Sequence, residues 1–134
     1  MIYGIGTDIV AVARMQDSLD KHGERFARRI LTDAEYDKYQ GHAHPAGFLA
    51  KRFAAKEATA KALGTGFRDG LSLQHIEVNN DVLGKPELKF YLRASELVGS
   101  LGIGASYLSL SDEKEFAVAY VVLTKAEDAS LVQH

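Results

Sequence analysis

The sequence FLAKRFAAKEATAKALGTG, from Phe48 to Gly66, decides the fold that we predict for this chain. It is rich in alanine, lysine and leucine, which are strong helix formers, and it contains no proline. Pro45 precedes it at a position that suits a helix start, and Gly64 is a stop signal. Alanine recurs at every fourth position, so we expect one side of this helix to pack closely against a sheet or another helix. That ridge consists of Ala50, Ala54, Ala58 and Ala62.

A neighbouring row on the same helix carries Phe53, Glu57 and Lys61, which are also four residues apart. Glu57 and Lys61 fit either an ordinary surface ion pair or a functional site. A lone carboxylate among cations, on a helix that ends in a glycine-rich loop, suits a Mg²⁺ ion bound to phosphate groups, provided that a second carboxylate lies nearby. The cations around Glu57 in the sequence are Lys51, Arg52, Lys56 and Lys61.

The N-terminal segment MIYGIGTDIVAV, residues 1–12, is rich in β-branched residues and predicts a strand. Alternation places Gly4, Gly6 and Asp8 on one face of that strand. The two glycines leave room for something to approach the backbone closely. Asp8 either ends the strand or supplies the second carboxylate.

Basic residues and a few apolar ones are concentrated in two short helices expected at 14–21 and 24–31. Such helices suit either an ordinary amphipathic packing or a surface that docks an acidic partner. A capping box at Thr32 predicts a further helix to about Gln40. The basic and apolar residues of the first two helices that could form such a docking surface are Arg14, Met15, Arg25, Phe26, Arg28 and Arg29.

The remaining segments predict an α+β domain, with a long central helix packed on an antiparallel or mixed sheet and short peripheral helices. His42 and His44 lie in a Gly/Pro loop and suit an exposed linker better than a metal site. We expect one domain over 1–124 and a polar, frayed tail over 125–134. The expected elements are strands 73–79 and 87–91 joined by a turn at 84–86, a helix at 92–101, and a hairpin of strands 107–111 and 115–123.

Composition excludes several classes of protein. The chain has 134 residues, a net charge of −2 and no cysteine. It therefore has no disulfide or thiolate site, and no overall basic field for nucleic acid. No leader and no apolar run of membrane length appear, so we expect a cytoplasmic protein that does not enter a membrane.

Three separated segments resemble one family: GTDIV at 6–10, the stretch Phe48 to Gly66, and GKP at 84–86 with SLSDEKEFAVAYVVL at 109–123. The family is that of the bacterial holo-acyl-carrier-protein synthases, the small 4′-phosphopantetheinyl transferases, and the resemblance covers nearly the whole chain. It implies Mg²⁺-dependent transfer of 4′-phosphopantetheine from coenzyme A to a serine of an apo-acyl carrier protein. The reaction releases adenosine 3′,5′-bisphosphate and serves fatty acid biosynthesis.

The resemblance also implies roles for individual residues. Asp8 and Glu57 match the Mg²⁺-binding carboxylates, and Lys61 matches a lysine near the scissile phosphate. Arg14 matches a position that faces the carrier protein. Because carrier proteins bear acidic helices, we expect other basic residues to steer docking and two apolar residues to supply contact. The predicted coenzyme A contacts are Arg52, Lys61, Gly84, Lys85 and Pro86, and the further docking residues are Met15, Arg25, Phe26, Arg28 and Arg29.

The family assembles as a homotrimer with each active site between neighbours. One chain supplies the Asp8 and Glu57 face, and the next supplies the 84–86 turn and the late hairpin. One departure matters: many members carry histidine where this chain has Asp112, which cannot attract phosphate as a protonated histidine can. Asp112 therefore puts a nucleotide contact at that position in question.

Two other functions compete with this one. The chain could be a non-catalytic binding module, or a different Mg²⁺-dependent transferase that acts on a nucleotide. Within the favoured function, the base that takes the serine proton is Glu57, Asp8 or a metal-polarised water, and a water oriented by a carboxylate is preferred.

Overall fold

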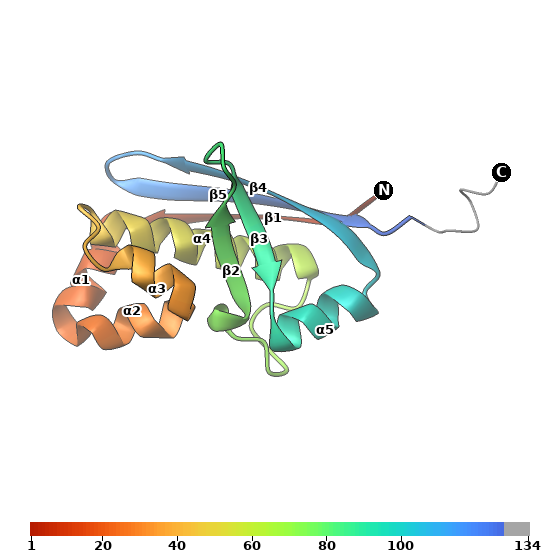
Figure 1. Ribbon diagram of the computed structural model, residues 1–134, viewed down its shortest axis with the longest axis horizontal. Coiled ribbons are helices and arrows are strands. Elements are labelled where there is room, and N and C mark those ends of the chain that lie inside the picture. Colours follow the sequence, from red (N-terminus) through yellow and green to blue (C-terminus); the bar gives the residue numbers. More distant parts are fainter. Residues whose placement is uncertain (128–134) are drawn as a thin grey trace.

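The computed structural model, described here for residues 1–127, is built around the long helix α4, Pro45–Leu63 (Figure 1). Pro45 occupies the first turn, where its missing N–H costs nothing. Gly64 ends the helix in the left-handed conformation, with φ of 83°. The sequence therefore predicted both the start signal at Pro45 and the stop signal at Gly64. The helix begins three residues before Phe48.

Three antiparallel strands form the sheet on which α4 packs. They are β1 (Ile2–Ala11), β4 (Ile103–Asp112) and β5 (Phe116–Lys125), in the order β1-β5-β4. The α+β fold is confirmed, and the sheet is antiparallel rather than mixed. Lys125 still belongs to β5, so the polar tail begins later than expected, and its residues 128–134 lie outside the described part of the chain.

The smaller elements surround α4. Figure 1 shows α1 (Val12–His22), α2 (Glu24–Ile30) and α3 (Asp33–Tyr39) gathered near one end of α4. A separate two-stranded sheet of β2 (Ile76–Asn80) and β3 (Pro86–Phe90) is followed by α5 (Leu92–Ser100). Residues 73–75, predicted as strand, form the short 3₁₀ helix η1 instead, because Ser72 caps them.

The closest packing in the fold joins α4 to β1. All four ridge alanines are at most 3% exposed, as their spacing predicted. A Cβ on Gly4 would lie 2.0 Å from the carbonyl oxygen of Ala62, and one on Gly6 would lie 1.8 Å from that of Ala58. The room that the glycines leave is therefore filled by the backbone of α4.

The other face of the same sheet is apolar and exposed. Ile5, Val122 and Tyr107 are neighbours across the three strands, and so are Thr7 and Tyr120 one pair further along. An exposed apolar surface of this kind marks an interaction site. The large side chains on it, each 45–62% exposed, are Ile5, Ile9, Tyr107, Phe116 and Tyr120.

The contact between Gly6 and Ala58 generates the first prediction. Gly6→Ala should lower the free energy of unfolding by at least about 1–3 kcal/mol, because the new methyl group overlaps backbone that cannot rotate away. Chemical denaturation measures the loss. Gly99→Ala, where a Cβ meets nothing within 4 Å, is the matched control and should be neutral or slightly stabilising. Equal stability of the two variants would contradict the close-packing account.

Candidate active site

Asp8, Lys61 and Glu57 come together where β1 meets α4. Asp8 lies on the inner face of β1, two residues after Gly6, and its register partner Ala119 is fully buried. The Nζ of Lys61 lies 3.0 Å from Oδ1 of Asp8 and also donates to the carbonyl of Thr7 at 3.0 Å. Asp8 on the strand and Lys61 on the helix, 53 residues apart in sequence, thus belong to one polar cluster.

The electrostatics of Glu57 show that it belongs to this cluster. Partial burial raises the pKa of the Glu57 carboxyl, and the negative charge of Asp8 raises it further. The positive charges of Lys61 and Arg14 act in the opposite direction. A carboxylate that is desolvated and repelled by a second carboxylate is the environment that a divalent cation relieves.

This donor set suits Mg²⁺ better than a metal held by protein alone. Mg²⁺ usually takes one or two carboxylates and completes six oxygen ligands with phosphates and water. Within residues 1–127, no group of three or more His, Asp or Glu side chains converges on a common point. The residues present therefore fit an ion whose other ligands come from substrate and solvent.

Arg14 on α1 lies near the cluster, and α2 carries further basic residues on its surface. The guanidinium of Arg14 lies 5.8 Å from the ring of Phe53, which is on the same helical row as Glu57. Arg25 and Arg28 on α2 are exposed, and the Arg28 guanidinium stacks 3.9 Å over the ring of Tyr36. Of these residues, Arg14 acts on the Glu57 carboxylate, while Arg25 and Arg28 are surface cations of α2.

Met15 is a correction to the predicted docking surface. It is 1% exposed and lies in the core, because its side of α1 packs against α4. In this conformation it cannot touch a partner, so among the predicted apolar contacts only the half-buried Phe26 remains available.

The prediction that Lys56 and Arg52 surround Glu57 with positive charge is wrong. Lys56 is fully buried and pairs with Glu35, so it does not face Glu57. Arg52 is 6% exposed, stacks 4.1 Å over the ring of Phe48 and lies 4.0 Å from Glu35. Its contact with coenzyme A stays a prediction.

The turn at residues 84–86 lies elsewhere in the single chain. Gly84 has φ of 87°, and Asp81 accepts hydrogen bonds from the N–H groups of Leu83 and Lys85 at 2.9 Å. Lys85 and Pro86 line a hollow of about 240 Å³ against residues 106–108 of β4. Because β4 is two strands from β1, and strands are about 4.8 Å apart, the turn lies at the sheet edge away from Asp8.

Asp112 lies at the end of β4, beside a cavity of about 440 Å³ that the sequence did not indicate. Its Oδ2 is 3.8 Å from the Nζ of Lys51, which offsets its negative charge. His42 and His44, predicted as an exposed linker, are exposed but line the same cavity. The sequence showed the His-x-His pair before a helix but gave no sign that the pair lines a cavity.

A larger cavity of about 490 Å³, between the α2–α3 junction and β2–β3, is lined by Thr32, Gln74, Glu77 and Tyr91 among others. It contains none of the predicted catalytic residues. We therefore place the candidate site at the β1–α4 cluster, where the carboxylates and the lysine meet.

The raised pKa of Glu57 generates the second prediction. An acid whose pKa is raised by folding destabilises the fold above its ordinary pKa, since the unfolded chain holds the ionised form better. Glu57→Gln should therefore raise the melting temperature at pH 7 in EDTA. The difference should vanish below about pH 4, where Glu57 is protonated in both states. Glu96→Gln, an exposed acid on α5, serves as control, and a destabilised Glu57→Gln variant would refute the account.

Comparison with known proteins places these observations in a family. Residues 4–121 match the family model of the 4′-phosphopantetheinyl transferase superfamily. The holo-[acyl-carrier-protein] synthase of Nitrosospira multiformis is 56% identical over 125 residues, which cover 93% of this chain and 100% of the relative.

Solved structures of the same family have the same fold as this chain. The crystal structure of holo-[acyl-carrier-protein] synthase from Neisseria meningitidis superposes with a TM-score of 0.89 at 46% identity, covering 93% of this chain and 100% of the other. A Bacillus anthracis holo-(acyl-carrier-protein) synthase in complex with CoA (3′,5′-ADP) has a TM-score of 0.78 at 42% identity, covering 94% and 99%. The similarity spans the β1–α4 cluster and nearly every element, and the chain belongs to the holo-[acyl-carrier-protein] synthases of the 4′-phosphopantetheinyl transferase superfamily.

Proposed function

We propose that this chain transfers 4′-phosphopantetheine from coenzyme A to a serine of an apo-acyl carrier protein, with Mg²⁺, and releases adenosine 3′,5′-bisphosphate. The observation that carries the proposal is the cluster of Asp8, Glu57 and Lys61. Membership of the family supports it, as does the Bacillus anthracis relative in complex with CoA (3′,5′-ADP).

Asp8 and Glu57 are the residues that hold the Mg²⁺ ion in this proposal. When bound, the ion neutralises charge on the pyrophosphate oxygens. Lys61 stands beside Asp8 with more than half of its side chain exposed, so its ammonium is free to turn towards a phosphate oxygen. These residues supply positioning and charge stabilisation, which account for most of the catalysis in phosphoryl transfer.

In the proposed chemical step one phosphoryl group moves from coenzyme A to the serine oxygen. The serine oxygen attacks the phosphorus next to pantetheine, a new O–P bond forms, and the P–O bond to adenosine 3′,5′-bisphosphate breaks. The serine proton passes to a water oriented by a carboxylate. Glu57 suits this role better than Asp8, because Asp8 is already paired with Lys61.

A direct assay tests the proposed function. Incubation of apo-carrier protein with this chain, coenzyme A and Mg²⁺ should add the mass of phosphopantetheine, and EDTA should abolish the gain. Asp8→Ala should lower the rate by about 10²–10³, the usual cost of losing a group that stabilises developing charge. Glu96→Ala, which removes an exposed acid on α5, should leave the rate unchanged.

The same assay separates the competing functions. A binding module predicts no mass gain and no effect of Asp8→Ala on partner binding. A transferase with a different acceptor predicts Mg²⁺-dependent consumption of coenzyme A without any carrier. Either result would overturn the proposal.

The exposed sheet face supports the further proposal of a homotrimer with active sites between subunits. Its apolar side chains need cover, and the turn at residues 84–86 lies at the sheet edge away from Asp8 in its own chain. In our proposal a second copy covers this face, and the turn at residues 84–86 of one chain then lies near Asp8 and Glu57 of its neighbour.

A charge on that face should break the assembly. Ile9→Glu places a carboxylate where the side chain is 62% exposed in the single chain. Light scattering should show the mass falling from three times 14.6 kDa to that of one chain, with loss of transfer. Leu92→Glu, on the exposed start of α5 and 73% exposed, is the matched control. A trimer that survives Ile9→Glu would rule this face out as the interface.

A further inference from the structure

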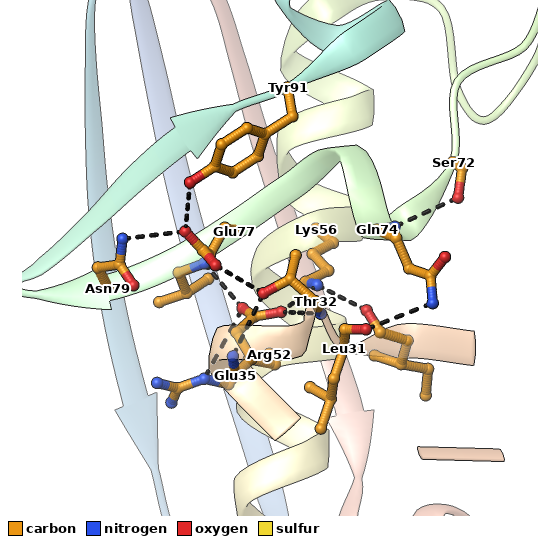
Figure 2. A network of polar contacts seen from close by, with 12 residues as sticks. Leu31, Thr32, Glu35, Arg52, Lys56, Ser72, Gln74, Glu77, Asn79 and Tyr91 are labelled. Carbon is orange, nitrogen blue, oxygen red and sulfur yellow. Dashed lines mark hydrogen bonds and ion pairs between the residues drawn. The ribbon is translucent and has the colours of Figure 1, made fainter. Parts of the chain in front are cut away.

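Three charged side chains are buried away from the candidate active site, where Glu35, Lys56 and Arg52 meet between α3, α4 and β2 (Figure 2). They are 1%, 0% and 6% exposed. Lys56 directly precedes Glu57 in sequence, but consecutive residues of a helix point about 100° apart. The same turn of α4 thus serves the active site on one side and this buried cluster on the other.

The ammonium of Lys56 joins the end of one helix to the start of the next. Its Nζ donates to the carbonyl of Ile30, the last residue of α2, at 2.6 Å and to Oε1 of Glu35 at 2.6 Å. The last carbonyls of a helix lack partners within the helix and favour a cation. Glu35 closes the capping box of α3 by accepting from the N–H of Thr32 at 2.9 Å. The turn between α2 and α3 is therefore built around a side chain of α4.

The carboxylate of Glu35 extends the junction to the second sheet. Its Oε2 accepts from the N–H of Val78 in β2 at 2.8 Å and lies 4.0 Å from the Nε of Arg52. Next to Val78, the carboxylate of Glu77 accepts from the hydroxyl of Thr32 at 2.6 Å. One carboxylate thus ties α3, α4 and β2 together.

The surface end of α2 is fastened in the same way. The amide nitrogen of Gln74, an exposed residue of η1, donates to the carbonyl of Arg28 and, at 3.4 Å, to that of Leu31. With Lys56, these contacts occupy the carbonyls at the C-terminal end of α2. The orientation of α2 is consequently set from two sides.

The carboxylates of the active site do not depend on this junction. The contacts of Gly4 and Gly6 with the backbone of α4 already fix Glu57 against Asp8. What the junction sets is the position of α2, with its exposed Arg25 and Arg28, relative to α4. The structure therefore separates two tasks: glycine packing holds the metal carboxylates, and the ionic junction holds the basic helix.

We propose that Lys56 and Glu35 are positioning residues of the carrier-protein docking surface, which hold α2 at a fixed place beside the active-site helix. The proposal rests on the proposed function, because its partner is the acidic carrier protein. A docked carrier delivers its serine to the carboxylates only if α2 and α4 keep their mutual position. A misplacement of about 1 Å can cost about 100-fold in rate.

The chemistry of the junction supports a positioning role over a purely stabilising one. Replacing a buried ion pair with apolar or neutral groups of similar size often leaves stability unchanged or improved. The burial of this ion pair is therefore weak evidence that it stabilises the core. Its value lies in directional bonds, which specify one arrangement of α2, α3 and β2 around α4.

The experiment removes the charges of Lys56 and Glu35 together, because losing only one of this pair would leave the other buried and unpaired. Arg52 loses its nearest carboxylate in this variant but keeps its stacking contact with Phe48. In Lys56→Met/Glu35→Gln we expect a folded chain whose kcat/KM for apo-carrier falls by about 10- to 100-fold. Carrier binding measured by interferometry should weaken in parallel. The affinity for Mn²⁺, read from its EPR signal, should stay within about two-fold, since the proposed metal carboxylates do not use α2.

Two further variants keep the test decisive. Leu97→Ala, a core truncation in α5, should lower the melting temperature without changing kcat/KM for the carrier, which separates positioning from general loss of stability. Gln74→Ala removes only the exposed contacts of α2, and it decides the matter if the double variant does not fold. It should lower kcat/KM for the carrier several-fold with no change in Mn²⁺ affinity.

A wild-type kcat/KM for the carrier in the folded double variant would overturn the proposal. If the double variant does not fold, a wild-type kcat/KM in Gln74→Ala would overturn it. An equal loss of carrier binding and Mn²⁺ binding would also overturn it, because the junction would then support the whole site. A wild-type chain that transfers nothing refutes the proposed function instead, and the direct carrier-binding measurement still decides on the junction.

Discussion

The approach of the α4 backbone to Gly4 and Gly6 is the constraint on which the rest of this structure depends. A Cβ at Gly6 would lie 1.8 Å from the carbonyl oxygen of Ala58, so no other residue type allows the helix to lie this close. Strand alternation then places Asp8 two residues along the same face, and the helical repeat places Glu57 and Lys61 opposite it. The acidic pair is a consequence of backbone packing between small residues.

Helix α4 meets a different neighbour on each side. Its alanine ridge lies on the sheet, Glu57 and Lys61 lie at the candidate active site, and Lys56 with Arg52 enters the junction of α2, α3 and β2. This division explains why its pattern is not that of a simple amphipathic helix, since even its buried side contains charges. It also leaves Lys61 and Arg14 as the cations that act on Glu57.

The sheet separates the functional parts of one chain. Its inner face and edge strand β1 carry Asp8, while β4 at the opposite edge borders the turn at residues 84–86. Its outer face is apolar and exposed. If the turn at residues 84–86 contacts coenzyme A, as we propose, the site is completed by placing copies side by side, and catalysis then depends on assembly.

The sequence by itself determined the features that depend on local order. The bounds of α4 follow from Pro45, Gly64 and helix propensity, and the capping box at Thr32 and the inner face of β1 follow from short patterns. Asp8 was one candidate for the second carboxylate beside Glu57, and the resemblance to the family implied that the two bind Mg²⁺ together. The motifs around them also indicated the family.

Only the tertiary structure decided which neighbours those faces meet. The partner of Lys56 is Glu35, 21 residues away, and Met15 lies in the core although its helix carries cations. The turn at residues 84–86 lies beside β4 rather than beside Asp8. Spacing within a helix or strand fixes the direction of a side chain, but the burial and charge it meets come from segments distant in the chain, and only packing brings those segments together.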